Sequence, residues 1–166
     1  MTISNGTVSS NALELCCDDI TEQIQSIAAQ SQYGPSAENI ARSVLEAYSP
    51  SPQNTLKNVL FLALHNNLVL GFLEMRITYD DAEIDFVAAD SAFRRLGIGK
   101  WLVSNALQYA NKQKAKRIIL EVGETNEAAI DLYKNVGFRQ IATRSKYYKN
   151  GENAFILEKR TENTTE

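Results

Sequence analysis

The chain has 166 residues and 44% hydrophobic content, which is enough for one domain with a full-sized core. Its net charge of -3 and pI of about 5.3 give no indication of wholesale nucleic-acid binding, whereas a mildly acidic surface suits a basic peptide. The sequence begins without the basic and apolar segments of a secretory signal. No apolar stretch approaches a membrane span, so a cytoplasmic protein is expected.

Polar segments bound the predicted domain at both ends. Residues 1–10 and 161–166 are polar and are expected to be disordered. Residues 11–160 contain no repeat and no low-complexity block, which predicts a single domain. This domain is expected to open with a short strand, indicated by the alternating apolar residues Leu13 and Leu15.

The cysteines and the histidine give no support for a metal site. Cys16 and Cys17 are adjacent, which is a poor geometry for a disulfide, and no metal-ligand partner accompanies them. They are expected to be strand residues in a reducing compartment. His65 is the only histidine and lies in a predicted turn, so a multi-histidine metal site is not available.

Two amphipathic helices follow. The spacing of Asp19 and Glu22 predicts a capping box at the start of the first helix. The second helix is expected to end in the proline-containing segment 49–52. The residues expected on its buried face are Ile40, Val44 and Leu45.

Three strands in a meander are predicted next. Residues 58–64 form a nearly continuous apolar run, which is typical of a buried strand. Residues 65–67 predict a hairpin turn, after which 68–79 return as the second strand. Residues 82–89 complete the meander.

A basic segment with spaced glycines separates the meander from a long helix. The strand ends at Asp90, after which come Arg94, Arg95, Gly97 and Gly99, and then an amphipathic pattern. Glycines let the backbone approach a phosphate, and the N–H groups of a first helical turn have no helical partner. The helix dipole and the guanidinium groups add positive potential. The segment therefore predicts an anion site, although a tight turn with exposed arginines is the alternative.

The remaining elements are a buried strand, a helix and two more strands. They are predicted at residues 117–122, 126–136, 138–147 and 153–157, and the last two strands flank the turn signal Asn150-Gly151. The helix is expected to direct Ala129, Leu132 and Val136 inward. The element order predicts an α/β fold, with a central mixed sheet flanked by about four helices.

Some residues in this part of the chain could transfer protons. Glu121 should lie at the C-terminal edge of the sheet, where a carboxylate can accept a proton, although a solvated strand-end charge explains it equally well. Glu124 is a second candidate, for which the solvated role is favoured. The phenol of Tyr133 could donate a proton to a thiolate, or the ring could be a core aromatic. Asn126 could cap the helix or contact a ligand.

The motif Arg94-x-x-Gly97-x-Gly99 resembles the acyl-CoA pyrophosphate loop of the GNAT superfamily of N-acetyltransferases, whose pattern is Gln/Arg-x-x-Gly-x-Gly/Ala. Within that superfamily, the C-terminal half is similar to the bacterial ribosomal-protein alanine N-acetyltransferases, and also to archaeal and eukaryotic N-terminal acetyltransferases. The similarity covers about residues 84–157, and the first half matches only in element order. The motifs that carry it are Glu121-Val122-x-x-x-Asn126, Leu132-Tyr133-x-x-x-Gly137-Phe138, Arg144-x-x-Tyr147-Tyr148 and Gly151-Glu152-x-Ala154.

This resemblance implies a single GNAT domain that uses acetyl-CoA as a co-substrate and needs no metal. It implies that Glu121 is the general base and Tyr133 the general acid, and that the Tyr147-Tyr148 pair closes over a peptide N-terminus. The backbone of residues 87–89 would line the acetyl and pantetheine arm, with an N–H group able to polarise the thioester carbonyl. The residues implied to contact acetyl-CoA are Val87, Ala88, Ala89, Arg94, Arg95, Leu96, Gly97, Ile98, Gly99, Lys100 and Asn126.

The chain departs from the family pattern on the substrate side. Asn153 stands where the family usually has Asp, and Lys149 where Pro is common. Tyr33-Gly34-Pro35 occupies the place of a tryptophan that is often seen between the first two helices. The cofactor is therefore better indicated than the acceptor.

The acceptor implied by the resemblance is a peptide N-terminal α-amine, such as the N-terminal alanine of a ribosomal protein. An α-amine has a pKa of about 7.7–8.0, against about 10.4 for lysine, so one carboxylate base suffices. The alternatives are an acetyltransferase for a small amine or a lysine side chain, and a non-catalytic acyl-CoA-binding regulatory domain. A monomer or weak homodimer is expected, without direct contact with nucleic acid or membrane.

Overall fold

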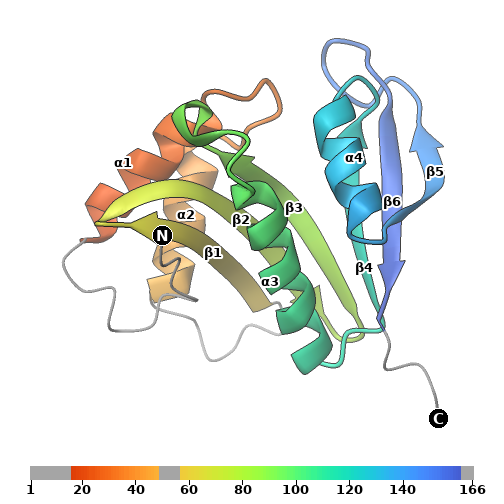
Figure 1. Ribbon diagram of the computed structural model, residues 1–166, viewed down its shortest axis with the longest axis horizontal. Coiled ribbons are helices and arrows are strands. Elements are labelled where there is room, and N and C mark those ends of the chain that lie inside the picture. Colours follow the sequence, from red (N-terminus) through yellow and green to blue (C-terminus); the bar gives the residue numbers. More distant parts are fainter. Residues whose placement is uncertain (1–15, 49–56, 162–166) are drawn as a thin grey trace.

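The computed structural model describes residues 16–48 and 57–161, which form a six-stranded mixed sheet with helices on both faces (Figure 1). The strand order is β1-β2-β3-β4-β6-β5. This is the predicted α/β fold, and the strand expected around Leu13 lies outside the described residues. The elements are α1 (Cys17–Ala28), α2 (Ala37–Tyr48), β1 (Lys57–His65), β2 (Leu68–Thr78), β3 (Asp81–Ala89), the 3-10 helix η1 (Ser91–Phe93), α3 (Ile98–Lys112), β4 (Arg117–Gly123), α4 (Glu127–Asn135), β5 (Arg139–Arg144) and β6 (Ala154–Arg160).

The start of α1 differs from the sequence prediction. Cys16 is the N-cap and Cys17 the first helical residue, so neither is a strand residue. The Cys16 sulfur accepts a hydrogen bond from the Asp19 backbone N–H at 3.4 Å, and the Asp19 carboxylate accepts one from the Cys16 N–H at 3.3 Å. The capping box therefore begins three residues before the predicted one, because a thiol fills the place of the usual hydroxyl.

The helices α1 and α2 cover one face of the sheet, and α3 and α4 cover the other (Figure 1). Ile40 and Val44 of α2 are buried as expected, but Leu45 is 62% exposed, so its predicted place on the buried face was wrong. A step of one residue turns the chain by about 100° around a helix, which carries Leu45 off the apolar stripe. On the opposite face, α3 buries Leu102 and Ala106 against the sheet.

The hairpin between β1 and β2 forms at the predicted turn. Asn66 and Asn67 have φ angles of 47° and 62°, the left-handed conformation that asparagine tolerates well. Two consecutive positive φ angles are typical of the turn type that matches the twist of a hairpin. The three predicted meander strands are thus confirmed with small shifts at their ends.

The strands β3 and β4 are paired over only a short length and then separate. Their parallel register runs from Asp81 opposite Arg117 to Ile84 opposite Leu120. A register shift against β2 leaves Asp85 without a partner on that strand. Beyond it, β3 continues along β2 alone and β4 along β6 alone, so the two strands diverge (Figure 1). The space between the diverging strands is called the β3–β4 cleft below.

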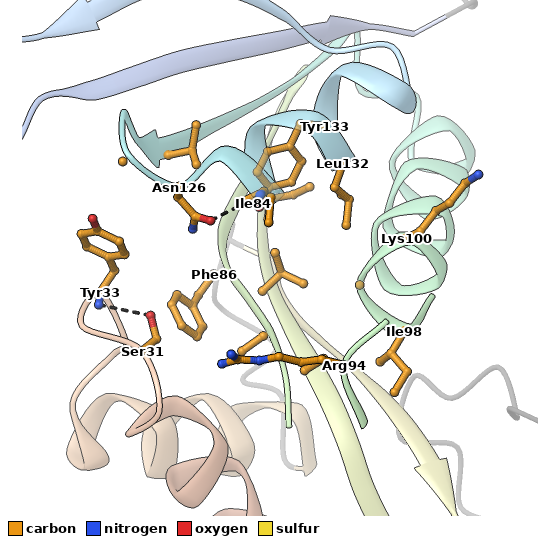
Figure 2. A pocket seen from close by; sticks show the side chains of 18 of the residues that line it. Ser31, Tyr33, Ile84, Phe86, Arg94, Ile98, Lys100, Asn126, Leu132 and Tyr133 are labelled. Carbon is orange, nitrogen blue, oxygen red and sulfur yellow. Dashed lines mark hydrogen bonds between the residues drawn. The ribbon is translucent and has the colours of Figure 1, made fainter. Parts of the chain in front are cut away.

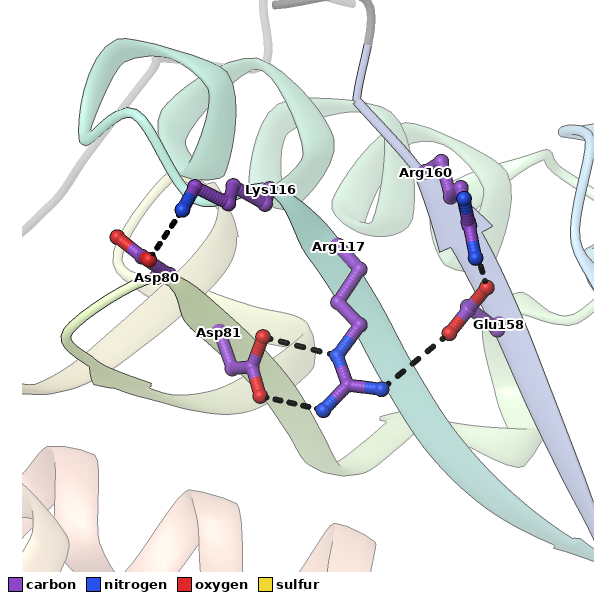
Figure 3. Close-up of polar contacts among 6 residues, drawn as sticks. All are labelled: Asp80, Asp81, Lys116, Arg117, Glu158 and Arg160. Carbon is purple, nitrogen blue, oxygen red and sulfur yellow. Dashed lines mark hydrogen bonds and ion pairs between the residues drawn. The ribbon is translucent and has the colours of Figure 1, made fainter. Parts of the chain in front are cut away.

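Ion pairs hold the closed end of the β3–β4 cleft (Figure 3). The Arg117 guanidinium donates two hydrogen bonds to the Asp81 carboxylate, at 2.9 and 2.7 Å, and also lies 3.6 Å from Glu158 of β6. Lys116 pairs with Asp80 at 2.6 Å. The hydrogen bonds from Arg117 lower the pKa of the Asp81 carboxyl. These contacts tie β3, β4 and β6 together at the end where the cleft begins.

The C-terminal part of the chain corrects two expectations and bears out a third. Thr161, expected to begin a disordered tail, is 5% exposed, and its hydroxyl donates to the Ala115 carbonyl at 2.6 Å. The loop between β5 and β6 spans residues 145–153. It is longer than predicted, because the strands around Asn150-Gly151 were expected to end at residue 147 and to resume at residue 153. The predicted Ala129 and Leu132 of α4, and Val136 just after it, pack against the core as expected and are partly buried, while Ile130 and Tyr133 are the buried residues of the helix.

Candidate active site

A cavity of about 1160 Å³ occupies the β3–β4 cleft. The second half of β3, the segment from η1 into α3, the end of β4 and the start of α4 form its walls. Every residue that was proposed for the site from the sequence lines this cavity except Glu124 and Leu96, and the Leu96 side chain is 58% exposed outside it. Figure 2 shows Asn126 and Tyr133 on one side of the cavity and Phe86 facing them from β3.

The N-terminus of α3 opens onto the cavity through the predicted glycine segment. Gly97 is the N-cap with φ 79°, and no side chain caps this helix end. The N–H groups of the first turn are therefore free of side-chain partners and carry the positive end of the helix dipole. Gly99 allows close packing, because a Cβ there would lie 3.1 Å from Leu132 of α4. Arg94 and Lys100 also line the cavity (Figure 2).

The β3 wall offers backbone as well as side chains. Val87, Ala88 and Ala89 pair with β2 on one edge, and β4 is not paired with them on the other. Their backbone groups on that second edge face the cleft, where a ligand could hydrogen-bond as an added strand does. The small side chains of the two alanines leave room for a close approach.

Glu121 lies at the end of β4 in a crowded polar setting. Its side chain is 20% exposed, and its Oε1 lies 2.5 Å from Nη1 of Arg144 on β5. Tyr147 also hydrogen-bonds to Glu121, which raises the pKa of the Tyr147 phenol. The carboxylate thus lines the cavity while held from the β5 side.

Tyr133 forms part of the cavity wall from α4. It is 5% exposed and packs edge-on against Phe138, with ring centroids 5.8 Å apart. Burial raises the pKa of its phenol, so the hydroxyl stays protonated across the physiological range. Tyr133 is therefore both a core aromatic and a cavity residue, which the sequence presented as alternatives.

The other two polar candidates differ in position. Asn126 is the N-cap of α4, where its Oδ1 accepts from the Ala129 N–H at 3.3 Å, and it also lines the cavity. Glu124 accepts hydrogen bonds from the backbone and side-chain amides of Asn153, at 3.1 and 3.0 Å, and does not line the cavity. Its carboxylate holds the β5–β6 loop.

A contact that the sequence did not predict closes one end of the cavity. The Tyr33 hydroxyl donates to Glu152, and the Tyr33 ring packs 4.4 Å from that of Tyr148. Glu152 also accepts from Thr125 at 2.9 and 2.8 Å. These hydrogen bonds lower the pKa of Glu152 to about 2, and the one from Tyr33 has the largest effect. Gly123 makes the contact possible, because a Cβ there would lie 2.6 Å from Glu152.

Within residues 16–48 and 57–161, no three His, Cys, Asp or Glu side chains are grouped so that they could hold a metal ion. Of the helices in those same segments, none is long and apolar enough to cross a membrane.

Comparisons with known proteins agree on one family. The model of the acetyltransferase (GNAT) family matches residues 24–138. An Escherichia coli [ribosomal protein bS18]-alanine N-acetyltransferase is 30% identical over 88 residues, which are 53% of this chain and 60% of that protein. A Sulfolobus acidocaldarius N-alpha-acetyltransferase is 36% identical over 72 residues, 43% of each chain. This chain therefore spans about half the length of the curated relatives that it matches.

A solved structure is similar at higher coverage. It is an acetyltransferase from Bacillus anthracis, assigned as a streptothricin acetyltransferase and solved in complex with acetyl coenzyme A. It is 27% identical to this chain with a TM-score of 0.60, and the match covers 69% of this chain and 66% of that one.

Proposed function

Because the chain belongs to the acetyltransferase (GNAT) family, we propose that it transfers the acetyl group of acetyl-CoA to the N-terminal α-amine of a peptide or protein. The observation that carries the proposal is the β3–β4 cleft, with an uncapped helix N-terminus at one end and Glu121 and Tyr133 along its walls. This arrangement supplies an anion site, a free strand edge and two proton-transfer groups in one cavity.

The residues present suit acetyl-CoA. The first turn of α3, with Arg94 and Arg95, would hold the diphosphate, since helix N-termini bind phosphate through bare N–H groups and the helix dipole. The free edge of β3 at residues 87–89 would hydrogen-bond the pantetheine amides, and one of its N–H groups would polarise the thioester carbonyl. The similar Bacillus anthracis structure, which contains acetyl coenzyme A, supports this choice of co-substrate.

In the proposed step, the neutral amine attacks the thioester carbonyl carbon, a C–N bond forms and the C–S bond breaks. Glu121 accepts the proton that the amine loses, and Tyr133 donates a proton to the departing sulfur. Burial keeps the Tyr133 phenol protonated, so its proton is available when the sulfur departs. Each role is of the kind that contributes roughly 10²–10⁴ in rate.

A peptide α-amine is the proposed acceptor, for two reasons. Its pKa of about 7.7–8.0 leaves a sizeable neutral fraction at pH 7, so one carboxylate suffices as base. The similar Escherichia coli and Sulfolobus proteins are named for the acetylation of a ribosomal-protein alanine and of an N-terminal α-amine. By analogy, the N-terminal alanine of a ribosomal protein is the first acceptor to test. The streptothricin assignment of the similar Bacillus anthracis structure favours a small-molecule amine as the second candidate.

The experiment is incubation with acetyl-CoA and a peptide that begins Ala-Arg, beside a version with a blocked N-terminus and a free lysine. Acetylation of the free N-terminus alone is expected, read by mass spectrometry. Modification of the blocked peptide alone would refute the α-amine proposal. A panel of small amines in the same assay tests the second candidate.

A further inference from the structure

Glu121 is paired with a cation of its own chain, although the proposed function needs it to serve an incoming amine. The Arg144 guanidinium lies 2.5 Å from the carboxylate, and the Arg144 side chain is 54% exposed while that of Glu121 is 20% exposed. Tyr147 lies over the guanidinium, with 5.4 Å from its ring centroid to the guanidinium carbon, and hydrogen-bonds to Glu121 as well. Arg144, Tyr147 and Glu121 thus hold one another in place.

We propose that Arg144 is a positioning residue that neutralises the charge of Glu121, so that the amine binds there uncharged and ready to react. This inference rests on the proposed function, in which Glu121 receives the proton of the acceptor amine. It assigns Arg144 no contact with acetyl-CoA and no proton transfer.

The charge beside Glu121 decides which form of the amine the pocket prefers. An unpaired and mostly buried carboxylate would bind an ammonium ion, because an opposite charge within ~4–6 Å favours the charged form by about 1–3 pKa units. A bound ammonium has no lone pair and cannot attack the thioester, so such a complex is unproductive. With Arg144 beside Glu121, an ammonium meets a like charge at the same place, and the preference for it is lost.

The other groups around Glu121 do not supply this positive charge. Glu83 of β3 is a negative neighbour. Tyr147 and Tyr148 are neutral phenols, and burial raises the pKa of Tyr148 to about 12. The nearby Arg76 is engaged by Glu83 at 3.2 Å and by Asp85. In the part of the chain that the structure describes, Arg144 is therefore the one cation in contact with Glu121.

The test is Arg144→Gln, with Arg139→Gln as the matched control, since Arg139 is exposed on the same strand. At pH 7, kcat and KM for the Ala-Arg peptide should both fall about tenfold, because a rise of one unit in the pKa of the bound amine changes its neutral fraction by that factor. The ratio kcat/KM should stay within about twofold, since it refers to free enzyme and free amine. The acid limb of kcat should move up by about one pH unit. Arg144→Lys should restore the wild-type kcat, KM and acid limb, and Arg139→Gln should change none of these values.

Two results would overturn the inference. One is unchanged kcat and KM in Arg144→Gln. The other is a rise in KM with a fall in kcat/KM, which would mean that Arg144 only holds Glu121 and Tyr147 in shape. Calorimetric titration of the CoA-saturated protein with the peptide at pH 6 gives a readout without turnover. Arg144→Gln should bind about tenfold more tightly than wild type, and equal affinities count against the proposal.

A wild-type protein that acetylates no peptide α-amine would refute the proposed function and not this inference. The same comparison of kcat and KM would then be made with the small amine that the wild type does acetylate.

Discussion

A negative charge placed at the N-terminus of α3 tests the proposed diphosphate site most directly. Gly97 has φ 79°, and a Cβ built there meets no atom within 4 Å. A side chain at this position would therefore be strained through its backbone but would not clash with a neighbour. Both Asn and Asp tolerate the left-handed conformation. Gly97→Asn is thus a neutral control of nearly the same shape for Gly97→Asp.

The expected magnitude follows from electrostatics. A carboxylate ~6 Å from one phosphate charge is disfavoured by about 2.8 kcal/mol at an effective dielectric constant of ~20. Screening with a Debye length of ~8 Å at physiological salt roughly halves this value. Because about 1.4 kcal/mol corresponds to a factor of ten, the Kd for acetyl-CoA should be about tenfold weaker in Gly97→Asp than in Gly97→Asn.

The assay is calorimetric titration with acetyl-CoA at two salt concentrations. The difference between the two variants should widen to several tens of fold near 10 mM salt, where the Debye length is ~30 Å. Equal affinities of the Asp and Asn variants at both salt concentrations would refute the location of the diphosphate. A loss shared by both variants would measure the backbone strain alone.

Three further predictions concern the walls of the cavity and the Tyr33–Glu152 contact at one end of it. Glu121→Gln should keep its affinity for acetyl-CoA while turnover falls by roughly 10²–10⁴. Glu124→Gln, which alters a carboxylate outside the cavity, should retain turnover. Equal losses of turnover in Glu121→Gln and Glu124→Gln would contradict the assignment of the general base to Glu121. Tyr133→Phe should lower turnover to a similar degree at normal acetyl-CoA affinity, whereas normal specific activity in a less stable protein would leave only the core role. The pKa of Glu152 is lowered to about 2, and the hydrogen bond from Tyr33 is the largest cause. This carboxylate therefore stabilises the fold at pH values above its unfolded pKa of ~4.3, and that stability is lost as the pH falls toward 2. In Tyr33→Phe, the fall of Tm between about pH 5 and 2 should be shallower, and an unchanged slope would contradict the cause assigned to that shift.

The parts of the fold that were predictable depend on local physics. The turn at Asn66 and Asn67 needs only the left-handed tolerance of asparagine, and the uncapped start of α3 follows from Gly97. The order of strands and helices followed from apolar periodicity. The error at Cys16 was also local, because a thiol rarely caps a helix, and the signal lay in the spacing of Cys16 to Asp19.

The contacts that shape the acceptor end were not predictable in the same way. The hydrogen bond from Tyr33 to Glu152 joins residues 119 positions apart, and neither flanking sequence encodes it. The sequence marked Glu121 as a candidate base but could not show that Arg144 pairs with it, because that depends on the strand order β4-β6-β5. Such pairs arise from tertiary placement, where local pattern carries no information.

The short pairing of β3 with β4 has a mechanical consequence. Within residues 16–48 and 57–161, the four-residue register from Asp81 to Ile84 is the only β-ladder that joins the β1–β3 half of the sheet to the β4–β6 half. The two halves of the sheet are therefore joined by a short ladder, which the ion pairs of Figure 3 reinforce. A cofactor lying along the cleft would contact both halves of the sheet and form a second connection between them. On the proposed function, the release of CoA would remove this second connection between the two halves of the sheet.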